Sequence, residues 1–144
     1  MNLTGHWRGT YTYGTGYPRS LCGKSEPFEL DIEEENGIFT GTCMDELVNA
    51  KQGNAAFIKG FFKSGRIQFK KTYKYHLLLN EANELTQEFG ETNGVDYTGR
   101  VRRKYFFFGE EYIAGHWSIT SNHTEGHETY THLCKGTWRM WKVH

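Results

Sequence analysis

The chain has 144 residues, and its 17 Lys and Arg balance 17 Asp and Glu, so the formal net charge at pH 7 is zero. This length predicts a single domain over residues 1–144. Balanced charge gives no indication of a nucleic-acid surface or of a face attracted to membranes. Aromatic residues make up 16% of the chain, which favours a thin shell with an aromatic interior and a polar exterior.

The start of the chain has neither a basic segment nor an apolar run, and no stretch approaches the roughly 20 apolar residues of a membrane-spanning helix. Cys22, Cys43 and Cys134 show no C-x-x-C spacing. They therefore predict neither a disulfide framework nor a zinc site. We expect a reduced, cytoplasmic protein.

The first predicted strand covers residues 3–11, and alternate residues share one of its faces because strand side chains alternate. These residues are Leu3, Gly5, Trp7, Gly9 and Tyr11. Glycine between large apolar residues weakens an ordinary strand, and it is typical of a sheet that coils tightly or receives a ring. The same pattern recurs at 39–43, 58–62, 97–101 and 113–117, with a near copy at 136–138.

A connection from Gly14 to about Ser25 leads to an alternating strand over residues 26–35. Asn36-Gly37 and Ser64-Gly65 predict tight hairpin turns. The strands expected around these turns cover residues 38–46, 55–63 and 66–75.

Residues 76–93 carry two patterns. His76–Leu79 can extend a strand, whereas Ala82, Leu85 and Phe89 have helical spacing. We predict a short strand and a loop with room for one helical turn.

The last part of the chain returns to strands, at 95–107, 112–121 and 129–142. A turn is expected at Gly109–Glu111 and a polar loop at 122–128, and the step from Leu133 to Gly136 predicts a bulge. The whole chain thus predicts eight to ten antiparallel strands without a long helix, in an up-and-down β-barrel or a sandwich. The inward glycines favour the barrel, with Gly5-Trp7 beside Gly136-Trp138 where its first and last strands meet.

Several short motifs resemble the calycin barrels, which include lipocalins, avidins and fatty-acid-binding proteins. Leu3-Thr4-Gly5-His6-Trp7 is similar to their opening Gly-x-Trp strand, residues 37–42 resemble the second avidin hairpin, and Ala114-Gly115-His116-Trp117 resembles a later tryptophan strand. Residues 14–25 resemble the first open-end loop of a lipocalin. The resemblance implies an all-β, lipocalin- or avidin-like up-and-down barrel with an interior site for a small, partly apolar molecule. No biotin-site residue is carried over.

A second resemblance is to the haem-binding nitrobindin barrels. Gly5-x-Trp7-x-Gly9 followed by Gly16-Tyr17-Pro18 is similar to their pattern. A haem needs an axial ligand inside the barrel, and no histidine falls clearly on the inward face. We therefore expect no cofactor. His116, His123, His127 and His132 are interpreted as solvated side chains rather than metal ligands.

Alternation places eight polar residues toward the interior as candidates for a ligand site: Tyr11, Tyr13, Asp45, Lys71, Tyr73, Tyr75, Tyr97 and Arg103. A buried charge needs a partner, a water-filled cavity or a position at the barrel mouth. One interpretation is a pocket for a ligand with an apolar body and an acidic or carbonyl group near Lys71 or Arg103. The other is an internal pair of Asp45 with Lys71 or Arg103, and tyrosines that fill the core.

Three functions therefore remain open. The first is a binding protein for a small organic ligand. The second is an isomerase or cyclase in which Asp45 accepts a proton while Lys71 or a tyrosine stabilises negative charge. The third is a structural barrel with a filled interior. Trp7, Trp117 and Trp138 are predicted to pack in the core. Phe57, Phe61 and Trp141 are predicted to face outward, where they allow a homodimer as well as a monomer.

Overall fold

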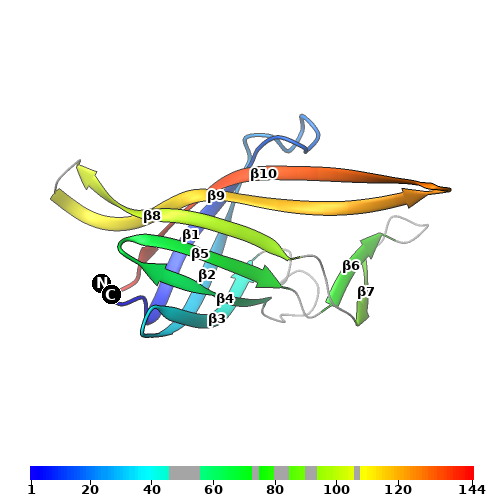
Figure 1. The fold of residues 1–144 in the computed structure, drawn as a ribbon. Coiled ribbons are helices and arrows are strands. Elements are labelled where there is room, and N and C mark those ends of the chain that lie inside the picture. The colour runs from blue at the N-terminus through cyan, green and yellow to red at the C-terminus, as the bar shows by residue number, and fades with distance from the viewer. Residues whose placement is uncertain (46–55, 73–74, 80–84, 90–93, 106–107) are drawn as a thin grey trace.

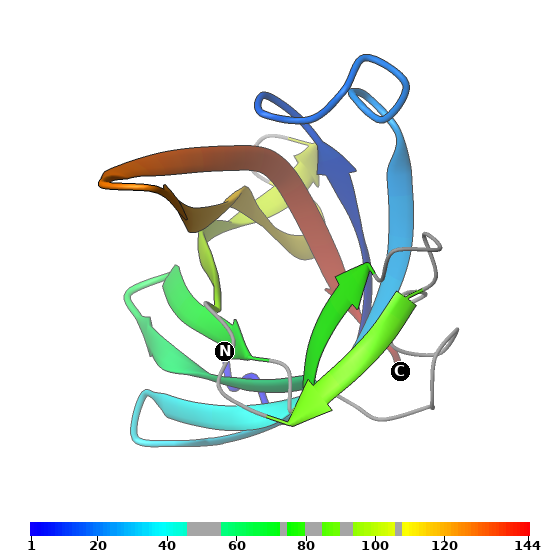
Figure 2. The same ribbon diagram turned by 90° about the vertical axis from the view of Figure 1, so that its right-hand side faces the viewer.

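The computed structural model is an all-β, closed antiparallel up-and-down barrel of eight strands (Figures 1 and 2). It describes residues 1–45, 56–72, 75–79, 85–89, 94–105 and 108–144. The strand order around the barrel is β1-β10-β9-β8-β5-β4-β3-β2. These strands are β1 (Gly5–Tyr13), β2 (Ser25–Glu35), β3 (Ile38–Asp45), β4 (Ala56–Lys63), β5 (Arg66–Thr72), β8 (Val95–Tyr105), β9 (Phe108–Glu125) and β10 (Glu128–Lys142). The predicted fold class is confirmed.

Between β5 and β8 the chain forms a separate two-stranded sheet of β6 (Tyr75–Leu79) and β7 (Leu85–Phe89). This hairpin lies at one end of the barrel (Figures 1 and 2). The connection 14–24 and the tip of the long β9–β10 hairpin lie at the same end, which we call the loop end (Figure 1). The opposite end, the turn end, carries both termini and the β2–β3 and β4–β5 turns (Figure 1).

Both predicted tight turns are confirmed by their backbone angles. Asn36 and Gly37 have φ values of 52° and 80°, and Ser64 and Gly65 have φ values of 52° and 74°. Two successive residues in the left-handed region characterise the hairpin turn whose twist matches that of the flanking strands.

The inward glycines lie opposite large side chains on neighbouring strands. Four pairs show the pattern: Gly9 with Phe28, Gly60 with Phe69, Gly115 with Trp138 and Gly136 with Trp117. The space above a glycine lets the facing ring lie flat against the backbone. The core is consequently aromatic and continuous around the barrel, as alternation predicted.

The first and last strands pair as expected, but their register differs from the prediction. Trp7 lies opposite Lys142, Tyr11 opposite Trp138 and Tyr13 opposite Gly136. Gly5-Trp7 therefore does not meet Gly136-Trp138. The observed register sets small residues beside large ones, with Gly9 opposite Met140 and Gly136 opposite Tyr13.

Three other predictions about the second half of the chain are wrong. Leu85 and Phe89 belong to β7 rather than to a loop or helical turn, because each pairs with a β6 residue. Gly109–Glu111 and most of the predicted polar loop lie within β9, which runs to Glu125. The β9–β10 pairing passes through Leu133–Gly136 without a shift, and the irregularity lies between Arg103 and Tyr105 instead. Ala82, the first residue of the helical spacing, falls outside the described residues.

No part of the chain that the structure describes forms a helix with the length and apolarity needed to cross a membrane.

Candidate functional site

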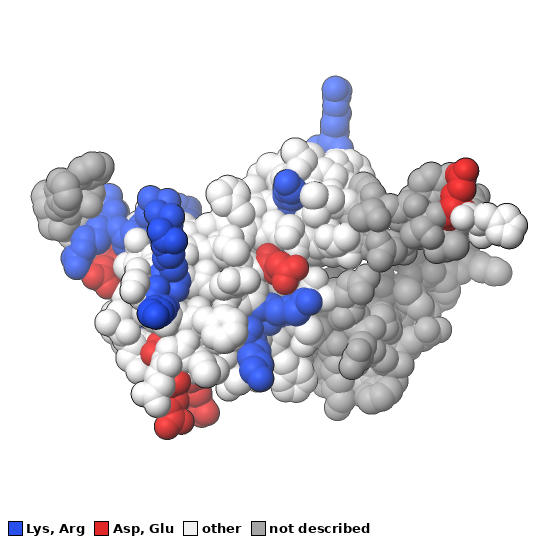
Figure 3. Space-filling model, in the orientation of Figure 1, with Lys and Arg blue, Asp and Glu red and all other residues white. Residues whose placement is uncertain are grey.

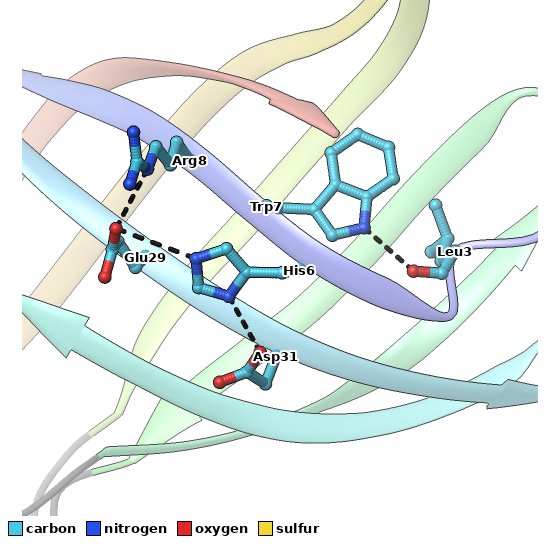
Figure 4. A network of polar contacts seen from close by, with 6 residues as sticks. All are labelled: Leu3, His6, Trp7, Arg8, Glu29 and Asp31. Carbon is cyan, nitrogen blue, oxygen red and sulfur yellow. Dashed lines mark hydrogen bonds and ion pairs between the residues drawn. The ribbon is translucent and has the colours of Figure 1, made fainter. Parts of the chain in front are cut away.

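The turn end of the barrel is closed by side chains of the first strand. Trp7 is 1% exposed, and its indole N–H donates a hydrogen bond to the Leu3 carbonyl oxygen at 2.8 Å (Figure 4). Leu3 is also fully buried. Trp7 therefore packs in the core as predicted, and it leaves the loop-end half as the place for an interior site.

Lys71 is the most unusual interior residue, because alternation along β5 directs it inward after Ile67 and Phe69. It is 4% exposed, and it is the one charged side chain that is buried in the described part of the chain. Its ammonium nitrogen lies 5.6 Å from the centre of the Tyr11 ring and 5.5 Å from that of Tyr97. Both distances are within the range in which an aromatic face attracts a cation.

A group of aromatic rings extends from Tyr11 toward the loop end. The Tyr11 ring centre lies 5.5 Å from that of Tyr13 and 6.2 Å from that of Trp117. Tyr17 extends the group from the 14–24 connection, since its ring centre lies 4.9 Å from Tyr13 and 5.8 Å from Trp117. We call the rings of Tyr11, Tyr13, Tyr17, Tyr97 and Trp117 the aromatic group.

Tyr17 fixes the connection over the loop end of the barrel. Burial raises the pKa of its phenol well above the usual value, and the neighbouring Cys134 thiol contributes to the same shift. The hydroxyl is therefore neutral at every physiological pH and can donate a hydrogen bond. Two thiols contact carbonyl oxygens of this connection: the Cys134 thiol of β10 lies 3.5 Å from that of Gly16, and the Cys22 thiol of the connection itself lies 3.0 Å from that of Gly14.

The structure brings together four of the eight predicted site residues: Lys71, Tyr11, Tyr13 and Tyr97. Arg103 does not join them. It lies at the turn end, is exposed, and donates to the Glu111 carboxylate at 2.6 Å. Arg103 lies near the barrel rim, one of the positions expected for an inward charge, and β8 becomes irregular after it.

The other three predicted residues do not add to the described site. Tyr75 begins β6, in the separate two-stranded sheet, and its side chain lies outside the described part of the chain. Asp45 ends β3 opposite Phe28, and its side chain lies outside the described part of the chain. Tyr73 also falls outside the described residues.

The sequence interpretation misses two members of the aromatic group. Tyr17 lies in a connection, where alternation carries no information about direction. Trp117 is predicted only to pack in the core, although it shares the inward face with Tyr97, which lies directly opposite it. The signal that could identify Trp117 is its position near the loop-end half of β9.

A separate polar network lies on the outer face of β1 and β2 (Figure 4). The His6 ring nitrogen Nδ1 lies 2.8 Å from the Asp31 carboxylate, and Arg8 donates to Glu29 at 3.0 Å. The hydrogen bond with Asp31 raises the pKa of His6, against a smaller opposing effect of burial. The alternation of these residues with Trp7 and Gly9 directs them away from the interior.

The arrangement gives the loop-end half an apolar wall, a neutral hydroxyl and a positive charge. Such a combination suits a small molecule with an apolar body and one acidic or carbonyl group. Among the described residues, no group of three or more His, Cys, Asp and Glu is placed to hold a metal ion. Comparison of the chain with protein-family models, with curated proteins and with solved structures finds no match.

Proposed function

We propose that this protein is a cytoplasmic, calycin-like barrel that binds a small, partly apolar organic ligand beside Lys71. The observation that carries the proposal is a buried ammonium between two tyrosine rings. The closed eight-stranded barrel supports the comparison with calycins, because barrels of this strand number have room for one small ligand.

The energetic argument rests on the surroundings of the charge. A positive group in an apolar environment acts on a ligand through a low effective dielectric, so its attraction for an acidic or carbonyl oxygen exceeds that of a surface lysine. The aromatic group supplies area for the apolar part of the ligand and hydroxyls for further hydrogen bonds. The plug formed by Trp7 and Leu3 directs any entry to the loop end.

The packing of the middle of the barrel favours a second candidate, a structural barrel with a filled interior. Phe69 and Tyr97 stack with ring centres 4.5 Å apart and an interplanar angle of 3°, and Trp138 packs against both at 5.6 and 5.7 Å. In that case Lys71 serves to fix the arrangement of the rings rather than to bind a ligand.

A pair of adjacent lysines gives a matched test of the two candidates. Lys70 and Lys71 are neighbours on β5, but Lys70 is exposed on the outer face. Lys71→Met should weaken binding of anilinonaphthalene sulfonate, an aromatic sulfonate probe, by about 10- to 100-fold, since a hydrogen bond to a charged group contributes about 1.5–3 kcal/mol. Lys70→Met should leave binding unchanged. The measurement is probe fluorescence together with quenching of tryptophan emission.

Equal binding by both variants and the wild type would contradict the site at Lys71. Absence of probe binding to the wild-type protein would favour the filled barrel. Native mass spectrometry of freshly purified protein provides an independent check. A bound species of small mass that is lost in Lys71→Met and kept in Lys70→Met would support the proposal.

A further inference from the structure

The charges on the outside of the barrel are separated by strand, although they cancel over the whole chain. The outward row of β2 is acidic and consists of Glu29, Asp31, Glu33 and Glu35. The outward positions of β5 and β8 carry Arg66, Lys70, Arg100 and Arg102, together with the acidic Asp96, which lies opposite Lys70. In Figure 3, basic side chains lie over β8, β5 and the β4–β5 turn, acidic ones gather near the β2–β3 turn, and a few acidic side chains lie beside the basic ones.

The basic side chains border two grooves that join on the outer face. The first groove has a volume of about 910 Å³, and Lys63, Arg66, Arg100 and Arg102 border it. The second has a volume of about 440 Å³ and is bordered by Arg102 and Arg139. Both grooves share Arg102, Ala114, Gly115 and His116, so they form one continuous channel across β5, β8, β9 and β10. We call it the basic track.

Local sequence explains why the track is hollow. The outward residues on either side of the paired inward glycines Gly99 and Gly115 are short, and they include Thr98 and Ala114. Short side chains form the floor, while the long arginine and lysine side chains stand at its borders. In the described part of the chain, no acidic residue lines either groove.

The cations of the track face one another across neighbouring strands. Arg66 lies directly opposite Arg100 across β5 and β8, and opposite Lys63 across β4 and β5. Like charges at directly opposite positions destabilise a sheet. Among the described residues, Arg8 and Arg103 form salt bridges with carboxylates, whereas none of the five track cations does so. The track is thus a concentration of positive charge, and a bound external anion would reduce the repulsion between its cations.

We propose that the basic track binds the phosphate backbone of a single-stranded nucleic acid. Four of its five cations are arginines, whose planar guanidinium groups suit phosphate oxygens. The continuity of the two grooves favours an extended polyanion over a compact one. Phe61 lines the first groove and is 62% exposed, which offers a base a ring to stack on. An acidic peptide or a bare polyphosphate would make no use of that ring.

The test compares two variants that remove the same charge. Arg66→Gln/Arg100→Gln/Arg102→Gln neutralises the track, and Arg19→Gln/Lys24→Gln/Lys135→Gln neutralises exposed cations near the loop end. Binding of a labelled oligothymidylate of about 12 nucleotides is measured by fluorescence anisotropy between about 50 and 200 mM salt. Thermal melting confirms that both variants are folded.

The track variant should bind the oligonucleotide at least about 10-fold more weakly than the wild type. The plot of log association constant against log salt concentration should become less steep by about 2, since the variant loses three phosphate contacts and each contributes about 0.7. The control variant should retain most of the affinity. Phe61→Ser should weaken binding without changing the salt slope, because stacking is not ionic.

Three outcomes would overturn the proposal. The first is absence of oligonucleotide binding by the wild type at the lowest salt. The second is equal loss of affinity in the track and control variants. The third is displacement of the oligonucleotide by inorganic polyphosphate or an acidic peptide as effectively as by unlabelled oligonucleotide.

Discussion

Gly136→Ala tests the close approach between ring and backbone on which the barrel interior depends. Gly136 on β10 faces Trp117 on β9 and Tyr13 on β1. A Cβ atom at this position would lie 2.3 Å from Cε2 of Trp117 and 2.1 Å from the Thr12 carbonyl oxygen. Both obstacles are rigid, because one is an aromatic ring and the other is the backbone of the neighbouring strand.

The expected cost follows from these distances. Carbon atoms pack at about 3.5–4.0 Å, so the Trp117 ring would have to retreat by more than about 1 Å. That movement would strain the hydrogen bond from the Trp117 indole N–H to the Thr137 carbonyl oxygen, which is 3.1 Å long. Overpacking costs about 1–3 kcal/mol and the weakened hydrogen bond about 1 kcal/mol. The free energy of unfolding should fall by about 2–4 kcal/mol, and the melting temperature by about 6–16 °C.

The assay is urea denaturation together with thermal melting, and Gly126→Asn is the control. Gly126 lies in the β9–β10 turn with φ of 65°, and a Cβ atom added there would have no neighbour within 4 Å. Asparagine tolerates this conformation, so the control should stay within about 0.5 kcal/mol of the wild type. Equal stability of the two variants would refute the reasoning. If the losses of unfolding free energy in Gly136→Ala and Trp117→Leu simply add in the double variant, the Trp117 ring is not the obstacle.

Two further predictions concern charged groups. The pKa of His6 should lie above 6.5 in an NMR titration and return toward 6.5 in Asp31→Asn, because the hydrogen bond with Asp31 raises it. The stabilisation from this pair should be complete at pH values below the pKa of His6 in the unfolded chain, and it should be lost as pH rises through the raised pKa of the folded protein. An increase in stability over that pH range would contradict the prediction. Arg103→Ala should cost less than about 1 kcal/mol in urea denaturation, because its pair with Glu111 is exposed, and it should not alter probe binding.

The inside and outside of the barrel could be predicted because alternation is a local property of each strand. Phe28, Leu30 and Ile32 are buried, whereas Phe57 and Phe61 are exposed, as their positions in the pattern indicate. The tight turns at Asn36-Gly37 and Ser64-Gly65 were likewise predictable, since few residue pairs accept left-handed angles twice in succession.

Properties that depend on distant parts of the chain could not be predicted in the same way. The register of β1 against β10 depends on how rings and glycines match across the seam, and neither strand alone contains that information. Leu85 and Phe89 have helical spacing, yet pairing with β6 places them in a strand. For the candidate site, Lys71 followed from its strand, while Tyr17 comes from a connection whose course depends on the barrel beneath it.

The pairing of β1 with β10 has a consequence for synthesis. The cylinder cannot close until β10 has left the ribosome, because Trp7 finds its partner only at Lys142. Until then β1 can pair with β2, but its other edge exposes backbone groups that a second nascent chain could capture. Assembly of this fold therefore depends on keeping one open strand protected while all the intervening strands are translated.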